Sequence, residues 1–381
     1  MANIVFLEVV QTFGGARKST IELATRLAKN HSVEIVDLYG SCGPFVEACQ
    51  KAGLPLTILQ KRDNPFLLSS SNVLKRICNY IYFIFHILQI NKSLRMYLAK
   101  YDKCWVMVNN SKALSFLFRK PRNITIALFA RGWFVRQQIS KIDRVLYGRL
   151  VDKYIAVSEA TRQAIYGAGL ASLQNIYVVH NAIDVPTVMP HIEHPSNRAV
   201  KILFAGGFLP TKGQRVAIGV AKSLVKEGLP FEMILAGIIY KGDVSQRYHD
   251  EIKKEIIDLQ LQDKVRLVVN NNDIRNLFDW CDIFCHPSDT EGLPRVVMEA
   301  MSMAKPVLAN AVGGVTDYIL NDYTGIITHH NDVDDYVAGI KRLCEDADLY
   351  YKITQRAFEL VSETYSEEAQ LNQFGRLLKN N

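Results

Sequence analysis

The stretch Ser288-Asp-Thr-Glu-Gly-Leu-Pro-Arg-Val-Val-Met-Glu-Ala-Met301 indicates how the rest of the chain folds. It follows the apolar run Cys281 to His286, which is typical of a buried strand, and Pro294 suits the first position of a following helix. The N–H groups of Arg295 and Val296 would open that helix at the carboxyl end of a parallel sheet, where they attract an anion. The stretch therefore predicts a phosphate-binding turn between a strand and a helix.

Two carboxylates frame this turn, because Glu291 lies in its loop and Glu299 lies eight residues later in the helix. Carboxylate and phosphate repel each other, so sugar hydroxyls are better partners for both side chains. We expect Glu299 to accept hydrogen bonds from a ribose and Glu291 to contact the transferred sugar of a nucleotide sugar. The spacing alone is equally compatible with solvated glutamates on an amphipathic helix, so the rest of the chain decides between the two interpretations.

The length of the chain indicates two domains. At 381 residues it exceeds the usual size of a single hydrophobic core, and its 49% hydrophobic and 22% charged residues are typical of a globular protein. Its seven cysteines are scattered without a Cys-x-x-Cys pair, which disfavours a disulfide framework or a zinc site and indicates a reducing compartment. The run from Met1 to Val10 lacks a basic start and is interpreted as a first strand, not as a signal peptide.

Positive charge is concentrated between residues 61 and 162. This region has 19 Lys and Arg against 5 Asp and Glu, although the whole chain carries a net charge of only +7. Nucleic acid is disfavoured as the partner, because no nucleic-acid-binding motif accompanies the charge and the interleaved aromatic residues lie in a hydrophobic run. An anionic membrane surface is the partner that this charge predicts.

Within the basic region, residues 73–95 are very apolar and are flanked by cations. The uncharged core of this stretch, residues 77–91, is short for a membrane span. Two interpretations stay open: a buried helix of the first domain, or an interfacial helix on anionic lipid. In the second, the headgroups would meet Lys75, Arg76, Lys92 and Arg95.

The first half of the chain alternates strands with helices. The runs interpreted as parallel strands of an α/β domain are residues 3–10, 33–38, 56–59, 104–108 and 124–129. Gly14-Gly15 follows the first strand and precedes a helix, where glycines let the backbone approach a ligand closely. The G-x-G-x-x-G fingerprint is absent, which disfavours a nicotinamide enzyme. Arg131 follows the last of these strands, and its guanidinium is suited to hold a phosphate or carboxylate.

A linker and a second α/β unit follow. Residues 185–198 contain three prolines and no periodicity, and they are interpreted as an interdomain linker. Residues 200–205 restart the strand pattern, and Lys212-Gly213 follows at the start of the next helix. Near the linker lie three histidines, His180, His191 and His194. They lack a carboxylate constellation, which disfavours a metal site.

Four pieces in this order resemble the retaining glycosyltransferases of family 4, glycosyl transferases group 1. They are Gly14-Gly15, Lys212-Gly213, the E-x7-E motif from Glu291 to Glu299, and Gly313-Gly314. The resemblance covers nearly all of the chain and implies the GT-B fold, in which two Rossmann-like α/β domains face each other across a cleft. The implied parts are an acceptor-binding domain (1–184), a linker (185–198), a donor-binding domain (199–364) and a C-terminal helix that crosses back to the first domain (365–381).

The resemblance also implies roles for single residues. Lys212 is expected to hold the donor diphosphate and to act in catalysis together with Glu291 and Arg131. The set implied to bind the donor is Gly14, Gly15, Gly207, Lys212, Gly213, Asn271, Glu291, Gly292, Leu293, Arg295, Val296 and Glu299. The chain departs from the family at two positions, because relatives often have a histidine where Arg131 stands and usually an arginine where Gly207 stands.

The implied function is transfer of a sugar, with retention of configuration, from a UDP- or GDP-sugar to a hydroxyl of a glycan or lipid-linked acceptor in cell-surface polysaccharide synthesis. We expect no metal or other cofactor. The scattered cysteines predict a cytoplasmic protein, and the basic region predicts peripheral contact with the inner face of the membrane. Two alternatives stay open: a nucleotide-sugar epimerase of the same fold, which should show acid and base residues near the sugar, and a non-catalytic, membrane-attached binding protein, which would explain both departures.

Overall fold

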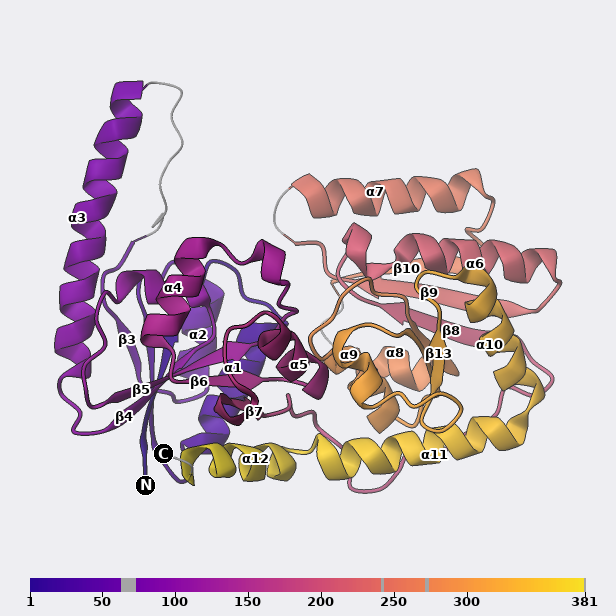
Figure 1. The fold of residues 1–381 in the computed structure, drawn as a ribbon. Helices are drawn as coiled ribbons and strands as arrows, with labels where there is room; N and C mark the ends of the chain where they lie inside the picture. The colour runs from indigo at the N-terminus through magenta and orange to yellow at the C-terminus, as the bar shows by residue number, and fades with distance from the viewer. Residues whose placement is uncertain (63–72, 241–242, 271–273, 380–381) are drawn as a thin grey trace. The chain divides into compact units, whose positions relative to one another are not determined.

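The computed structural model describes residues 1–62, 73–240, 243–270 and 274–379, and the side chains of all of these except 73–81 and 138. The chain divides into two compact units (Figure 1). Unit 1 comprises Met1–Val157, Thr161–Val179 and Leu371–Asn381, and unit 2 comprises Ser158–Ala160 and His180–Gln370. Residues 185–198, interpreted above as a linker, thus cluster with unit 2.

Unit 1 is built on a seven-stranded parallel sheet with the strand order β3-β2-β1-β4-β5-β6-β7. Its strands are β1 (Asn3–Glu8), β2 (Ser32–Asp37), β3 (Leu56–Ile58), β4 (Cys104–Val108), β5 (Ile124–Ala130), β6 (Lys153–Ala156) and β7 (Ile176–Val178). The order reverses at β1, which lies between β2 and β4, so the carboxyl end of β1 is a topological switch point.

Both faces of this sheet are covered by helices, which explains why its strands are apolar at successive positions. Val5 and Leu7 belong to one core, with side chains of α3 (Val73–Leu98) and α4 (Lys141–Leu150). Ile4 and Phe6 belong to the core on the other face. That face is covered by α1 (Gly15–Leu27), α2 (Gly43–Lys51) and α12 (Glu367–Lys379). A further helix, α5 (Glu159–Gly167), follows β6.

Unit 2 is built on a six-stranded parallel sheet with the order β10-β9-β8-β11-β12-β13. Its strands are β8 (Val200–Ala205), β9 (Phe231–Gly237), β10 (Val265–Val269), β11 (Ile283–His286), β12 (Val307–Asn310) and β13 (Ile326–Thr328). Its helices are α6 (Gln214–Lys226), α7 (Asp243–Asp258), α8 (Arg275–Trp280), α9 (Arg295–Ser302), α10 (Val333–Glu345) and α11 (Ala347–Thr364). Two Rossmann-like parallel sheets confirm the predicted α/β class. The strand order of the second sheet reverses at β8, which lies between β9 and β11, so the carboxyl end of β8 is the second switch point.

Two local predictions are refined by the structure. Pro294 precedes α9 as its N-cap residue, with φ −71° and ψ 110°, and the helix itself begins at Arg295. The apolar stretch 73–95 forms part of α3, whose inner face is buried at Ile90 and Leu94, whereas much of its outer face is exposed. Among the residues that the structure describes, we find no helix with the length and apolar character to span a bilayer.

Candidate active site

Three side chains from the carboxyl ends of β8 and β11 meet in unit 2. The Lys212 Nζ lies 2.5 Å from the Glu291 Oε1, and the His286 Nε2 lies 3.1 Å from the same oxygen. Lys212 ends the short helix η4 (Pro210–Lys212) before α6, and His286 is the last residue of β11. The structure therefore brings together two predicted catalytic residues, Lys212 and Glu291, and adds a histidine that the sequence analysis did not select.

The charge of Glu291 is set by these neighbours. Burial alone raises the pKa of this carboxyl, but the hydrogen bond and positive charge of His286, with those of Lys212, lower it to about 2. Glu291 is therefore a carboxylate throughout the neutral pH range. It is suited to accept hydrogen bonds or to balance a cation, and it is a poor acceptor of a proton.

The loop that carries Glu291 is shaped by the Gly313-Gly314 turn after β12. Gly313 has φ +50°, and a Cβ atom there would lie 1.7 Å from the Glu291 carbonyl oxygen. Next to it, the Gly314 N–H donates to the Gly292 carbonyl oxygen at 3.0 Å. A side chain at Gly313 would push the loop away, so this glycine pair positions the Glu291 backbone.

Gly213 has a similar role on the other side of the site. It has φ +76° between η4 and α6, and a Cβ atom there would lie 2.1 Å from the carbonyl oxygen of Pro287. Pro287 follows His286 directly. The glycine thus lets Lys212 and the end of β11 approach each other closely.

The first turn of α9 presents N–H groups and no acidic side chain. Within the helix, the Arg295 Nε lies 3.6 Å from the Glu299 Oε1, one turn further on. Two predicted donor contacts are engaged within the protein, because Leu293 is buried and the Gly292 carbonyl oxygen already accepts a hydrogen bond from the Gly314 N–H. The positive end of the α9 dipole lies here and favours an anion.

An apolar cavity of about 250 Å³ adjoins this helix start. It is lined by Ala205, Gly206, Gly207, Ala236, Gly237, Ile238, Ile274, Leu277 and Val296. Gly206 also packs on Lys212, since a Cβ atom at Gly206 would lie 3.4 Å from the Lys212 Cβ. The cavity, the cation and the start of α9 are therefore contiguous.

Gly207 marks the place where the family usually has an arginine, and Tyr240 packs against it. A Cβ atom at Gly207 would lie 2.4 Å from the Tyr240 Cε2 and 2.8 Å from its hydroxyl oxygen. A larger residue at 207 therefore requires the tyrosine to move. Asn271, predicted to contact the donor base, lies outside the described residues.

A second polar cluster lies in unit 1, around the carboxyl end of β1. The Arg131 Nε donates to the Asn109 Oδ1 at 3.0 Å, and its Nη2 lies 3.4 Å from the Thr20 Oγ1 in α1. The Asn109 Nδ2 donates to the Glu8 Oε1 at 2.6 Å, and the Arg17 Nε lies 3.6 Å from the Glu8 Oε2. Arg131 is thus joined to α1 and β1, in unit 1, whereas Lys212 and Glu291 belong to unit 2.

Glu8 is fully buried, and its charge is correspondingly unusual. Burial raises the pKa of this carboxyl to about 7, against the lowering effects of Arg17, the Asn109 hydrogen bond and Arg131, and nearby Asp37 raises it further. The Glu8 Oε2 has no hydrogen-bond partner among the described atoms. At neutral pH, Glu8 is therefore divided between its charged and neutral forms.

The predicted Gly14-Gly15 turn begins α1 beside this cluster. Gly14 has an extended backbone and precedes the helix, and Gly15 is the first helical residue. A Cβ atom at either glycine would meet no described atom within 4 Å. Packing within the described part of the chain therefore does not require glycine there, and the turn leaves its surroundings open.

Glu8 and His286 were missed by the sequence analysis for the same reason. Each is the last residue of an apolar strand and was read as part of the strand's core. In a parallel sheet, a polar residue at that position lies at the edge where ligands bind. This position was the signal that could have identified both residues.

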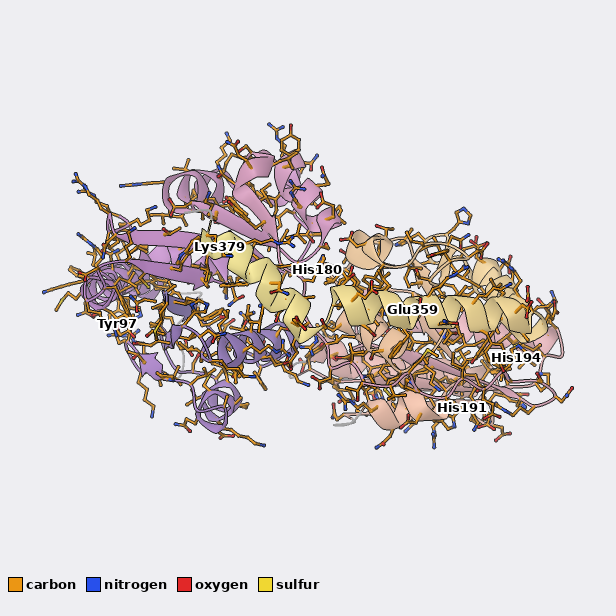
Figure 2. The ribbon with its side chains drawn as sticks, turned by 90° about the horizontal axis from the view of Figure 1, so that it is seen from below. Tyr97, His180, His191, His194, Glu359 and Lys379 are labelled. Atoms are coloured by element: carbon orange, nitrogen blue, oxygen red, sulfur yellow. The ribbon has the colours of Figure 1, made fainter. Side chains whose placement is uncertain are left out.

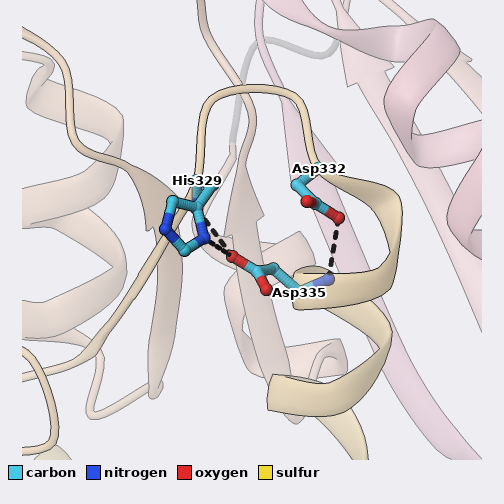
Figure 3. Close-up of side chains that lie close together, drawn as sticks. All are labelled: His329, Asp332 and Asp335. Carbon is cyan, nitrogen blue, oxygen red and sulfur yellow. Dashed lines mark hydrogen bonds and ion pairs between the residues drawn. The ribbon is translucent and has the colours of Figure 1, made fainter.

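Elsewhere in unit 2, His329, Asp332 and Asp335 lie close enough together to hold a metal ion (Figure 3). Their existing hydrogen bonds explain this arrangement. Asp332 caps α10 by accepting from the N–H groups of Asp334 and Asp335, and Asp335 accepts from the backbone and the ring of His329. The cluster is interpreted as a helix cap.

The three histidines near the predicted linker do not form one site. In Figure 2, His180 lies apart from His191 and His194. The centroid of the His180 ring lies 4.7 Å from the centroid of the Tyr365 ring, and burial lowers the pKa of His180 to about 4. The His194 Nε2 lies 2.9 Å from the Leu343 carbonyl oxygen. These contacts give both residues packing roles.

Several known proteins that resemble this chain in sequence or fold are glycosyltransferases. An uncharacterized glycosyltransferase of Haemophilus influenzae is 22% identical over 98% of both chains. The Escherichia coli UDP-Gal:alpha-D-GlcNAc-diphosphoundecaprenol alpha-1,3-galactosyltransferase is 29% identical over 45% of this chain and 46% of its own. The crystal structure of Anabaena Alr3699/HepE in complex with UDP and glucose is similar to this structure over 100% of each chain, with a TM-score of 0.77 and 20% sequence identity.

The fold shared with that structure is GT-B, as the sequence predicts. Residues 191–360, which contain Lys212, Glu291 and the whole of α9, match the family model of the glycosyl transferases group 1. Over residues 191–360 the chain therefore matches the glycosyl transferases group 1, and a relative along almost its whole length is a glycosyltransferase.

Proposed function

We propose that this glycosyltransferase moves a sugar from a UDP- or GDP-sugar to a hydroxyl of a glycan or lipid-linked acceptor, with retention of configuration and without a metal ion. The observation that carries the proposal is the contiguity of three features in unit 2. They are the apolar cavity, the Lys212–Glu291 pair and the start of α9.

The donor suits these features part by part. A nucleobase is a flat, largely apolar ring system, and the cavity beside β8 and β9 has apolar walls and a volume of about 250 Å³. The diphosphate would lie between Lys212 and the N–H groups of Arg295 and Val296. Glu299, one turn into α9, would accept from the ribose hydroxyls. The UDP complexes of Alr3699/HepE and the UDP-Gal in the name of the Escherichia coli relative favour uracil as the base.

The low pKa of Glu291 supports transfer without a protein base. In the proposed step, the bond between the anomeric carbon and the diphosphate breaks while the acceptor oxygen bonds to the same face of the sugar. The acceptor proton passes to the leaving diphosphate, whose new charge Lys212 and the α9 amides stabilise. Glu291, a carboxylate at neutral pH, would accept hydrogen bonds from the transferred sugar.

Charge neutralisation by Lys212 and the helix start is also the reason for proposing a metal-independent reaction. A divalent cation in other nucleotide enzymes serves this purpose. Here a lysine beside the diphosphate site would supply the positive charge. The proposal predicts full activity in the presence of a chelator.

For the acceptor we propose a glycan or a lipid-linked glycan of a cell-surface polysaccharide. Several relatives support this class by their names, among them the amylovoran biosynthesis glycosyltransferase AmsK of Erwinia amylovora and the putative colanic acid biosynthesis glycosyltransferase WcaL of Escherichia coli. In unit 1, Arg131 and the open Gly14-Gly15 turn are the groups proposed to meet the acceptor. The protein would then act in the cytoplasm, in peripheral contact with the membrane that carries the acceptor.

The test is donor binding and donor turnover by the purified chain. Thermal shifts with UDP, GDP and ADP would identify the base, because binding to the folded state raises Tm. We expect Lys212→Ala to lower the release of nucleoside diphosphate from the right donor sugar by about 10²-fold to 10³-fold. Lys254→Ala is the matched control, since the Lys254 side chain is 78% exposed on α7 and should leave turnover unchanged.

The same experiment separates the alternatives. A transferase releases nucleoside diphosphate slowly in water and faster with acceptor, and NMR of the product shows whether the anomeric configuration is retained. Interconversion of donor sugars without release would instead identify an epimerase. Nucleotide binding with neither reaction would identify a binding protein, and the absence of any nucleotide shift at millimolar concentration would refute the proposal.

A further inference from the structure

Helix α4 of unit 1 exposes an apolar stripe between cations. Ile142 is 80% exposed and Val145 is 70% exposed. With Leu146 and Phe118 they line a groove of about 490 Å³, whose remaining lining residues are Lys141 and Arg149. Positions 142, 145 and 149 recur at helical spacing, so the apolar residues and Arg149 share one face. The one acidic residue of α4, Asp143, is held at the helix start by Ser140.

Helix α3 continues this character on its outer face. Tyr82 and Phe85 are exposed near the middle of the helix, at 59% and 64%, and Leu88 is half exposed. Further along, the exposed residues include Lys92 and Arg95. No acidic residue occurs in the sequence of α3.

The two helices cover the same face of the unit 1 sheet. Ile90 and Leu94 of α3 and Leu150 of α4 belong to one hydrophobic core. Both helices also pack against η1 (Ser111–Phe116), which precedes Phe118. Because both helices pack on the same face of the sheet, the outer sides of both helices point away from that face. Figure 1 shows α3 and α4 as separate helices of unit 1.

We propose that unit 1 docks on an anionic lipid surface through the outer faces of α3 and α4. The apolar side chains enter the interface, and the cations meet the headgroups. The residues that make this docking surface are Tyr82, Phe85, Leu88, Lys92, Arg95, Phe118, Lys141, Ile142, Val145 and Arg149. The inference rests on the membrane contact in the proposed function and names the surface that makes it, and it can be tested without the transfer reaction.

Charge complementarity selects this partner. The two helices together contain one acidic residue, and their exposed apolar side chains lie next to Lys and Arg. This combination matches the boundary between phosphate headgroups and acyl chains. Nucleic acid would use the cations but leave Ile142 and Val145 in water. A second copy of the chain would bring Lys141 and Arg149 close to other cations of the same surface, and like charges repel.

Vesicle co-sedimentation of the full-length protein tests the proposal without donor or acceptor. We expect binding to phosphatidylcholine vesicles that contain 30% phosphatidylglycerol, at least ten-fold tighter than to pure phosphatidylcholine and weakened by 0.5 M NaCl. Ile142→Ser with Val145→Ser should lower the partition coefficient at least ten-fold. Lys141→Gln with Arg149→Gln should lower it about 25-fold, since each cation contributes about five-fold.

The matched control is Val225→Ser with Ile257→Ser, which removes two half-exposed apolar residues from α6 and α7 of unit 2 and should leave binding unchanged. Circular dichroism and Tm establish that each variant is folded. Equal binding to neutral and anionic vesicles, or unchanged binding of both α4 variants, would overturn the proposal. So would a wild-type dimer that the α4 variants convert to a monomer without any change in vesicle binding.

Discussion

Glu8 gives unit 1 a pH dependence that a single substitution should remove. The carboxyl is fully buried at the end of β1, and burial raises its pKa from 4.5 to about 7. Its charged and titratable neighbours are Arg17, Arg131 and Asp37, with Asn109 as a hydrogen-bond donor. Replacing Glu8 by Gln keeps the shape and the oxygen that Asn109 contacts, but removes the titration.

The sign and size follow from proton linkage. The folded state binds the Glu8 proton more tightly than the unfolded state does, so the free energy of unfolding falls as pH rises through the interval from 4.5 to about 7. Between pH 5 and pH 8 the loss is about 2 to 3 kcal/mol, since each unit of pKa shift corresponds to about 1.4 kcal/mol. The Glu8→Gln variant should lose that much less stability over the same interval.

Urea denaturation at pH 5 and pH 8 measures the difference. The chain has three tryptophans, and Trp280→Phe removes the one in unit 2, so that fluorescence reports on Trp105 and Trp133 of unit 1. Trp105 is buried in the unit 1 core and should respond strongly to unfolding. A difference of about 2 kcal/mol exceeds the usual error of linear extrapolation.

Glu34→Gln is the matched control in the same sheet. Burial raises the pKa of Glu34, but hydrogen bonds from Tyr97 and Lys100 lower it overall, so Glu34 titrates below the tested interval. The Glu34→Gln variant should show the same change in the free energy of unfolding between pH 5 and pH 8 as the wild type. Equal pH dependence in wild type and Glu8→Gln would show that Glu8 is charged in the folded protein and would refute the reasoning.

Two glycines of unit 2 yield further predictions. Gly313→Ala should displace the Glu291 loop, because the new Cβ would meet the Glu291 carbonyl oxygen at 1.7 Å, and nucleotide-induced thermal shifts should vanish while circular dichroism stays native. Retained shifts would contradict this role. Gly207→Arg should lower Tm by several degrees, corresponding to about 1 to 3 kcal/mol of overpacking against Tyr240, and Tyr240→Ala should restore it. Additive losses in the double variant would show that the two residues do not interact.

Much of the fold followed from local chemistry. The apolar runs before Gly14 and Ser288 predicted strands because a sheet covered by helices on both faces needs apolar residues at successive positions. The run 73–95 predicted a helix with cations at its ends, and the sequence left open whether that helix is buried. The structure shows that one side of the helix is buried, at Ile90 and Leu94, and that the other side is exposed, at Phe85.

Spacing and turn chemistry also placed Glu291 in a loop and Glu299 in the following helix. What they could not reach were contacts between residues far apart in the chain. The bond between Lys212 and Glu291 joins positions 79 residues apart, and its length depends on Gly213 and Gly313 letting backbones approach. Such contacts depend on strand order and packing, which side-chain periodicity does not encode.

Charge state was likewise decided by the tertiary structure. The pKa values of two glutamates with the same intrinsic acidity are shifted in opposite directions, that of Glu291 to about 2 and that of Glu8 to about 7. Hydrogen bonds and positive charge from His286 and Lys212 outweigh burial at the first, whereas burial prevails at the second. The sequence specifies where a carboxyl occurs along the chain, but the balance between burial and nearby charge exists only once the strands have assembled.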